Sequence, residues 1–181
     1  MALNFNIFRF YHIPKTGGNY FRKIIKVIGI ETSESGHVHC SPLDLMDNNK
    51  NVSITIVRHP FTWYESYYRY RVVTGWRDNH FIDQHAAADS FEKFVLNMQR
   101  AYPCGYVTAR YISVIPFCRY IFRTENLTHD FSFFLKRLGY SFPENISKIK
   151  VTPKEIDTSI SAKAKNKLLN AESRIIRYLG Y

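Results

Sequence analysis

The sequence predicts an α/β protein in which a mostly parallel sheet is flanked by helices. Two observations carry this prediction. Two short apolar runs, residues 8–13 and 52–57, are each followed by a polar loop and then by a helix-like pattern. The second run, VSITIV, is rich in β-branched residues, which is typical of a strand buried on both faces of a parallel sheet. In such sheets the ligand binds at the carboxyl ends of the strands.

Length and charge limit the functions that the chain can have. The 181 residues, 45% of them hydrophobic, fit one domain over residues 1–181 and leave no room for a second of similar size. The 25 Lys and Arg against 15 Asp and Glu give a net charge of +10. We therefore expect an anionic partner, such as a nucleotide, a polyanionic glycan, a nucleic acid or a membrane surface.

The sequence predicts a soluble, cytoplasmic protein. The first residues, MALNFNIFRF, lack the pattern of a signal peptide, and no window reaches the ~20 apolar residues that a membrane-spanning helix needs. The cysteines, Cys40, Cys104 and Cys118, are few and scattered. This favours buried free thiols over a disulfide framework.

The loop after the first apolar run is predicted to bind phosphate or sulfate. It consists of Lys15, Thr16, Gly17 and Gly18, and a helical pattern begins at Tyr20. The glycines let the backbone approach a ligand, the first N–H groups of the helix point into the loop, and the lysine adds a positive charge. It is not a Walker A loop, because its lysine precedes the glycines. A turn that merely needs glycine is the alternative, and the lysine and threonine ahead of the glycine pair favour the anion site.

A short extended segment, residues 36–40 (GHVHC), places His37 and His39 on the same side of the chain. Two histidines at this spacing suggest zinc, but no further Cys or His at zinc-site spacing accompanies them. The sequence therefore gives no support to a metal site.

The second strand, residues 52–57, is followed by another candidate anion contact. Thr62 and Glu65 match a capping box, which predicts that a helix begins at Thr62 and continues through Tyr70 or beyond. Arg58 would then end the strand and Ser66 would lie near the start of the helix. We expect both to face one anion, together with the helix N-terminus.

The sequence of the remaining chain predicts further elements of an α/β fold. These are an irregular loop over 74–89 that is a candidate lid, a helix capped by Ser90, an ambiguous aromatic stretch over 102–116, a strand at 119–123, a helix over 127–138, a linker at 148–154 and a last helix over 160–179.

Three motifs in this order resemble those of sulfotransferases that use 3′-phosphoadenosine 5′-phosphosulfate (PAPS). They are residues 12–18 (HIPKTGG), residues 36–38 (GHV), and Arg58 with Ser66 and Tyr67. The resemblance is greatest to the branch that contains the heparan and chondroitin 2-O-sulfotransferases, and it spans most of the chain. It departs at Asn19, where the family loop usually has a hydroxyl residue, but the amide can still donate a hydrogen bond.

The resemblance implies a P-loop-like three-layer fold and a set of donor contacts. Residues 15–20, including Asn19 and Tyr20, would hold the 5′-phosphosulfate. Arg58, Ser66 and Tyr67 would hold the 3′-phosphate, and Lys150 in the linker would fold over the donor. His37 would be the catalytic base, with His39 as the reserve candidate.

The predicted function is O-sulfotransfer from PAPS to a hydroxyl, with adenosine 3′,5′-diphosphate as the second product and no metal required. The resemblance favours a carbohydrate acceptor, and no nucleic acid or membrane partner is expected. A nucleotide kinase is one alternative, but Arg58 stands where a magnesium-binding carboxylate would be sought. A polyanion-binding module without activity is another, supported by the net charge and the 16% aromatic content. The oligomeric state is not set by the sequence.

Overall fold

The computed structural model describes residues 2–4, 8–36, 42, 52–143, 146, 153 and 155–181. The chain divides into two compact units. We call Met1–Arg58 with Tyr111–Lys150 the sheet unit, and His59–Arg110 with Val151–Tyr181 the helical unit. Compactness does not decide whether each unit folds alone. The expectation of one domain over residues 1–181 therefore stays a prediction.

The described residues of the sheet unit form one five-stranded sheet in the order β3-β1-β2-β4-β5. The strands are β1 (Ala2–Asn4), β2 (Phe8–Tyr11), β3 (Ser33–Ser35), β4 (Val52–Val57) and β5 (Tyr120–Arg123). β2, β4 and β5 are parallel, whereas β1 is antiparallel to both β2 and β3. The predicted mixed α/β fold is confirmed, with a parallel part of three strands.

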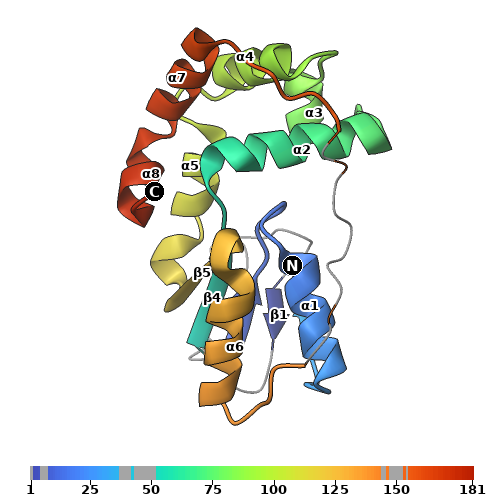
Figure 1. Cartoon of the computed structure of the whole chain (residues 1–181), viewed down its shortest axis with the longest axis vertical. Helices are drawn as coiled ribbons and strands as arrows, with labels where there is room; N and C mark the ends of the chain where they lie inside the picture. Colours follow the sequence, from blue (N-terminus) through green and yellow to red (C-terminus); the bar gives the residue numbers. More distant parts are fainter. Residues whose placement is uncertain are drawn as a thin grey trace. The chain divides into compact units, whose positions relative to one another are not determined.

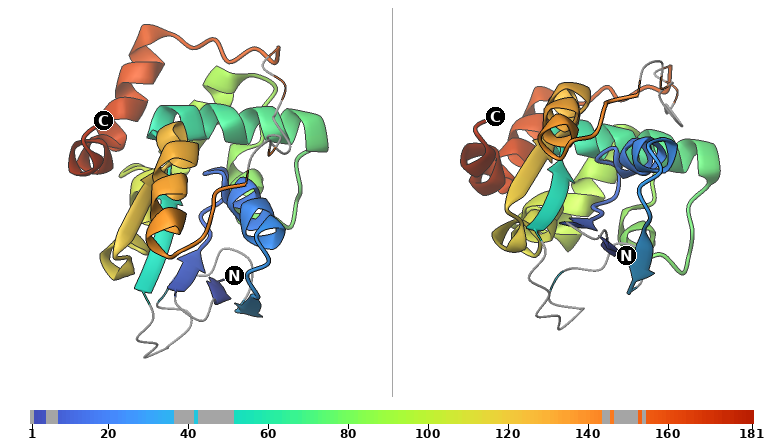
Figure 2. Two further views of the ribbon diagram at one scale, coloured as in Figure 1. Left: turned by 60° about the horizontal axis from the view of Figure 1, so that its bottom comes forward. Right: turned by 90° about the horizontal axis from the view of Figure 1, so that it is seen from below.

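Two helices cover one face of this sheet, α1 (Gly18–Val27) and α6 (Leu127–Arg137), as Figures 1 and 2 show. Their core contacts come from alternate strand residues, which point to the same face. The Phe21 ring of α1 lies 4.3 Å from that of Phe10 in β2 and 4.4 Å from that of Phe131 in α6, measured between centroids. One aromatic side chain thus joins both helices to the sheet.

The helical unit is built around aromatic side chains. Its helices are α2 (Pro60–Thr74), α3 (Phe81–Ala86), α4 (Phe91–Ala101), α7 (Ala162–Ala171) and α8 (Ser173–Leu179), while α5 (Tyr106–Ile112) crosses the unit boundary along the chain. Trp63 and Tyr67, one turn apart on α2, stack with centroids 5.1 Å apart. Phe94 of α4 packs against Tyr64, Tyr67 and Tyr68 of α2. This packing makes α2 the central helix of the unit.

The start of α2 corrects one prediction. The helix begins at Pro60, with His59 as N-cap, and not at Thr62. Proline suits the first helical position because its fixed φ matches a helix and its missing N–H has no partner there anyway. The Thr62 hydroxyl donates to the His59 carbonyl, and Glu65 accepts from Arg69. The predicted capping box does not form.

Three other predictions have mixed outcomes. The Ser90 cap is confirmed, because its hydroxyl accepts from the Lys93 N–H. The loop predicted over 74–89 is not irregular throughout, since it contains α3. The last helix is divided at Glu172 into α7 and α8.

The described cysteines and helices bear on two further expectations. Cys104 and Cys118 are free thiols, as predicted, but Cys104 is exposed and Cys118 is half-buried, and burial raises the pKa of the Cys118 thiol to about 12. None of the helices within the described part of the chain combines the length and hydropathy that a bilayer crossing needs.

Candidate anion-binding site

The predicted anion loop follows β2 and meets the end of β4 at one edge of the sheet. Because the two strands are parallel and Tyr11 pairs with Thr55, the residues that follow them leave the sheet on the same side. Arg58 Nη1 donates to the Lys15 carbonyl over 3.3 Å. Lys15 and Arg58, which are 43 residues apart in the chain, are therefore neighbours, and both are half-buried.

The loop backbone is strained at the lysine itself. Lys15 has a φ of 64°, and it is the only residue other than glycine with a positive φ in the part of the chain that the structure describes. A left-handed conformation costs a residue with a Cβ roughly 1–2 kcal/mol. Such conformations persist where the surroundings fix them, and they cluster at functional sites.

The two glycines of the loop are required for different reasons. Gly17 is the N-cap of α1 with a φ of 94°, which favours glycine. Gly18 lies so close to the His12 ring that an added Cβ would be 2.2 Å from it. The sequence analysis attributed both glycines to ligand approach, but Gly18 has a packing requirement of its own.

Two hydroxyl groups hold this loop. Thr16 is fully buried, and its hydroxyl donates to the Ile13 carbonyl over 2.7 Å. The Thr124 hydroxyl, which follows β5, lies 2.7 Å from the Thr16 carbonyl and 2.9 Å from the Val57 carbonyl. The Thr16 hydroxyl is therefore engaged within the loop, and the contact of Thr16 with a donor stays a prediction.

A third hydroxyl fixes the backbone of Arg58. The Tyr111 phenol accepts from the Arg58 N–H over 2.8 Å and donates to the Arg58 carbonyl over 2.9 Å. Sequence analysis gave a role to neither Thr124 nor Tyr111. The position of Thr124 directly after a predicted strand was an available indication, because the third parallel strand ends at the same edge of the sheet.

Positive charges outnumber negative ones at this edge. Lys15 and Arg58 supply two positive charges, the exposed Glu125 that follows Thr124 supplies one negative charge, and the first turn of α1 contains no acidic residue. The first N–H groups of a helix have no acceptors within the helix, and they carry the positive end of its dipole. Asn19 is exposed in this turn, whereas Tyr20 is half-buried with its hydroxyl 3.3 Å from that of Thr128.

Two other predicted donor contacts belong to the helical unit. Ser66 is buried and is the seventh residue of α2, which places it about 9 Å along the axis from the first residue. Ser66 thus lies in the second turn of α2, and its contact with the anion stays a prediction. Tyr67 is buried, and its hydroxyl donates to Asp83 over 2.6 Å. Burial, together with this hydrogen bond, raises the pKa of the Tyr67 phenol well above its usual range.

Three predicted residues, His37, His39 and Lys150, lie outside the described residues. Among the residues that are described, no group of three or more His, Cys, Asp or Glu side chains is placed to hold a metal ion.

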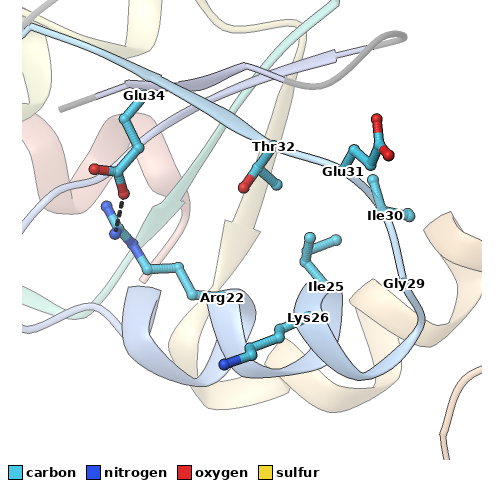
Figure 3. Close-up of a pocket in the computed structure, with 8 residues that line it drawn as sticks. All are labelled: Arg22, Ile25, Lys26, Gly29, Ile30, Glu31, Thr32 and Glu34. Carbon is cyan, nitrogen blue, oxygen red and sulfur yellow. Dashed lines mark hydrogen bonds and ion pairs between the residues drawn. The ribbon is translucent and has the colours of Figure 1, made fainter.

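A pocket of about 450 Å³ lies beside the later part of α1 and the segment that follows it (Figure 3). Arg22 and Lys26 line it together with Glu31 and Glu34, and Arg22 pairs with Glu34 at 3.2 Å. These charges cancel, so the pocket does not select for anions. It lies away from the first turn of α1, where the predicted anion loop ends.

Comparisons with known proteins do not assign the chain to a family. No protein-family model matches the chain, and the searches of curated proteins and of solved structures found no match.

Proposed function

We propose that the protein is a PAPS-dependent O-sulfotransferase on a P-loop-like three-layer fold, with a carbohydrate as the favoured acceptor. The observation that supports this most is the meeting of Lys15 and Arg58 at the carboxyl edge of two parallel strands. Both residues belong to motifs that resemble the donor site of that family. Two fixed cations and a helix N-terminus suit a ligand with several negative charges.

In the proposed reaction an acceptor hydroxyl attacks the sulfur in line, and adenosine 3′,5′-diphosphate leaves. Lys15 and the N–H groups at the start of α1 stabilise the charge that develops on the bridging oxygen. His37 removes the hydroxyl proton, with His39 as the reserve base. The predicted contacts of Asn19, Tyr20 and Lys150 with the donor belong to the same proposal.

Arg58 and Ser66 are the proposed contacts of the 3′-phosphate. Arg58 presents a fork of donors from a backbone that is fixed at both its N–H and its carbonyl. Tyr67 follows Ser66 in the motif, but its hydroxyl already binds Asp83. Its expected contribution is therefore to hold α2 in place.

The test is calorimetry with adenosine 3′,5′-diphosphate and with adenosine 5′-monophosphate, which lacks the 3′ group. Arg58→Ala or Ser66→Ala should weaken the binding of the diphosphate by about 1.5–3 kcal/mol, the range for hydrogen bonds to a charged group. The binding of the monophosphate should hardly change. Arg119→Ala is the control, because this exposed arginine precedes β5 at the opposite edge of the sheet. Equal losses for both nucleotides would contradict the 3′-phosphate assignment.

A thermal-shift screen separates this function from the alternatives. PAPS and adenosine 3′,5′-diphosphate should stabilise the protein, since a ligand that binds only the folded state raises its stability. Preference for ATP with magnesium would indicate a kinase. Stabilisation by heparin alone, lost at high salt, would indicate a polyanion-binding module. Mass spectrometry of candidate acceptors after incubation with PAPS then tests for the transferred group.

A further inference from the structure

The two cations of the proposed donor site are held by hydrogen bonds to the backbone around them. Lys15 is strained, and the two carbonyls that follow its strained φ, those of Lys15 and Thr16, accept hydrogen bonds from distant residues. Arg58 binds the Lys15 carbonyl, and Thr124 binds the Thr16 carbonyl. The loop geometry therefore depends on groups that are more than 40 residues away in the chain.

Thr124 connects the loop to the neighbouring strand. β5 pairs with β4 in parallel, with Arg123 opposite Val57, so Thr124 arrives at the edge where β4 ends. Its single hydroxyl hydrogen lies within reach of the Thr16 and Val57 carbonyls, at 2.7 and 2.9 Å. Both carbonyls must stay close to one oxygen atom, and this sets the separation between the loop and the end of β4.

Tyr111 fixes the backbone of Arg58. Residue 58 lies beyond the last residue of β4, where the ladder of the sheet ends. The fully buried Tyr111 supplies both an acceptor and a donor to its backbone. The Arg58 side chain therefore extends from a fixed point.

We propose that Thr124 and Tyr111 are positioning residues for the anion site: Thr124 fixes the Lys15 loop and Tyr111 fixes Arg58. Neither need touch the ligand. Charge stabilisation depends on donors being held in place before the reaction, and a displacement of ~1 Å can cost a factor of ~10² in rate. The assignment of these roles to transfer and to donor binding rests on the proposed function.

The test of Thr124 compares three variants. Thr124→Val keeps the shape and removes the hydroxyl, and it should lower turnover with PAPS about 10- to 100-fold. Thr124→Ser keeps the hydroxyl and should restore most of the turnover. Thr55→Val is the matched control, because the buried Thr55 hydroxyl donates to the Tyr11 carbonyl over 2.9 Å between the same β2 and β4. It should lower the thermal midpoint as Thr124→Val does, with turnover kept.

Tyr111 is tested by affinity. Tyr111→Phe should weaken the binding of adenosine 3′,5′-diphosphate about fivefold or more, because Arg58 is no longer held in place to contact the 3′-phosphate. The binding of adenosine 5′-monophosphate should be unchanged. Tyr68→Phe is its control, since the Tyr68 phenol donates to the Asp89 carbonyl over 3.1 Å in the helical unit. Equal weakening of both nucleotides would overturn the role given to Tyr111.

Amide hydrogen exchange separates this inference from the proposed function. Thr124→Val should speed exchange across residues 15–20 at least tenfold, whereas Thr55→Val should not, whether or not PAPS binds. Unchanged exchange, or equal losses of turnover in Thr124→Val and Thr55→Val, would overturn the positioning role. If the wild type binds no adenosine 3′,5′-diphosphate while the exchange result holds, the sulfotransferase proposal fails and the positioning of the loop stands.

Discussion

Two carboxylates of the helical unit and two cations of the sheet unit have different environments. In the helical unit, Glu172 is fully buried, and Asp83 is buried beside Arg71, with 2.8 Å between carboxylate and guanidinium. In the sheet unit, Lys15 and Arg58 remain half-buried at the edge of the sheet. The buried carboxylates are surrounded by donors from the protein itself and serve the fold. The two cations at the sheet edge are the proposed contacts of an added anion.

The two carboxylates also explain local structure in the helical unit. Glu172 accepts from the N–H groups of Val107 and Thr108 at the start of α5. Asp83 accepts from the Arg77 N–H and so pins the segment that sequence analysis predicted to be a lid. Changes at these acids should therefore alter stability, and changes at Lys15 should alter function.

The largest effect is expected for Glu172→Ala. Its carboxylate also accepts from the Tyr64 and Thr108 hydroxyls, at 2.7 and 2.6 Å. Buried donors left without an acceptor cost about 1–3 kcal/mol each, so we expect the free energy of unfolding to fall by at least ~3 kcal/mol. Urea unfolding followed by tryptophan fluorescence measures this, since both tryptophans, Trp63 and Trp76, belong to the helical unit.

The exposed Glu155 of the same unit is the control for this measurement. Glu155→Ala should change the free energy of unfolding by no more than ~0.5 kcal/mol. A loss below ~1 kcal/mol for Glu172→Ala would mean that the buried carboxylate does not stabilise the unit.

Lys15→Ala should, in contrast to Glu172→Ala, lower activity and leave stability nearly unchanged. Sulfuryl transfer should fall by roughly 10², or about 2.7 kcal/mol, as when one preorganised charge-stabilising donor is removed. The thermal midpoint should hardly change. Lys26→Ala, at an exposed lysine in the last turn of α1, should keep full turnover. Near-normal turnover of Lys15→Ala would remove this lysine from the mechanism.

A smaller effect tests the backbone strain at Lys15. Alanine would keep the cost of the left-handed conformation at residue 15, whereas glycine would relieve it. Lys15→Gly should therefore be more stable than Lys15→Ala by about 1 kcal/mol, although both lack the charge. Calorimetric unfolding of the two variants gives the difference. An alanine variant as stable as the glycine variant would show that the loop relaxes to a negative φ.

The smallest effect concerns the pH dependence of stability, through His80 in the helical unit. Burial lowers the pKa of His80, and the positive charges of Arg71 and Arg77 lower it further, although the nearby Asp83 carboxylate acts in the opposite direction. The unfolded chain therefore binds a proton first as pH falls below about 6.5, and stability should decline from there until the folded-state pKa is reached. His80→Asn should remove this part of the pH dependence of the thermal midpoint between pH 7.5 and 5.5. The same substitution at the exposed His129 is the control.

Local sequence patterns predicted the three parallel strands and the two helices that cover them, but not the short antiparallel strands β1 and β3. The β-branched run at 52–57, the glycine pair after β2 and the apolar spacing of α6 each depend on neighbours within a few residues. These patterns also placed Lys15 and Arg58 just after strand ends, and the parallel pairing of β2 with β4 is what brings the two together.

Only the tertiary structure decided what holds these residues. Thr124 and Thr16 are 108 residues apart, and Tyr111 and Arg58 are 53 apart, so no local period relates them. The burial of Tyr67 against Trp63 and Asp83, and the close approach of Gly18 to His12, likewise arise from packing between elements. Propensity and capping patterns describe one segment at a time, whereas a hydrogen bond to a buried carbonyl depends on which segments the fold brings together.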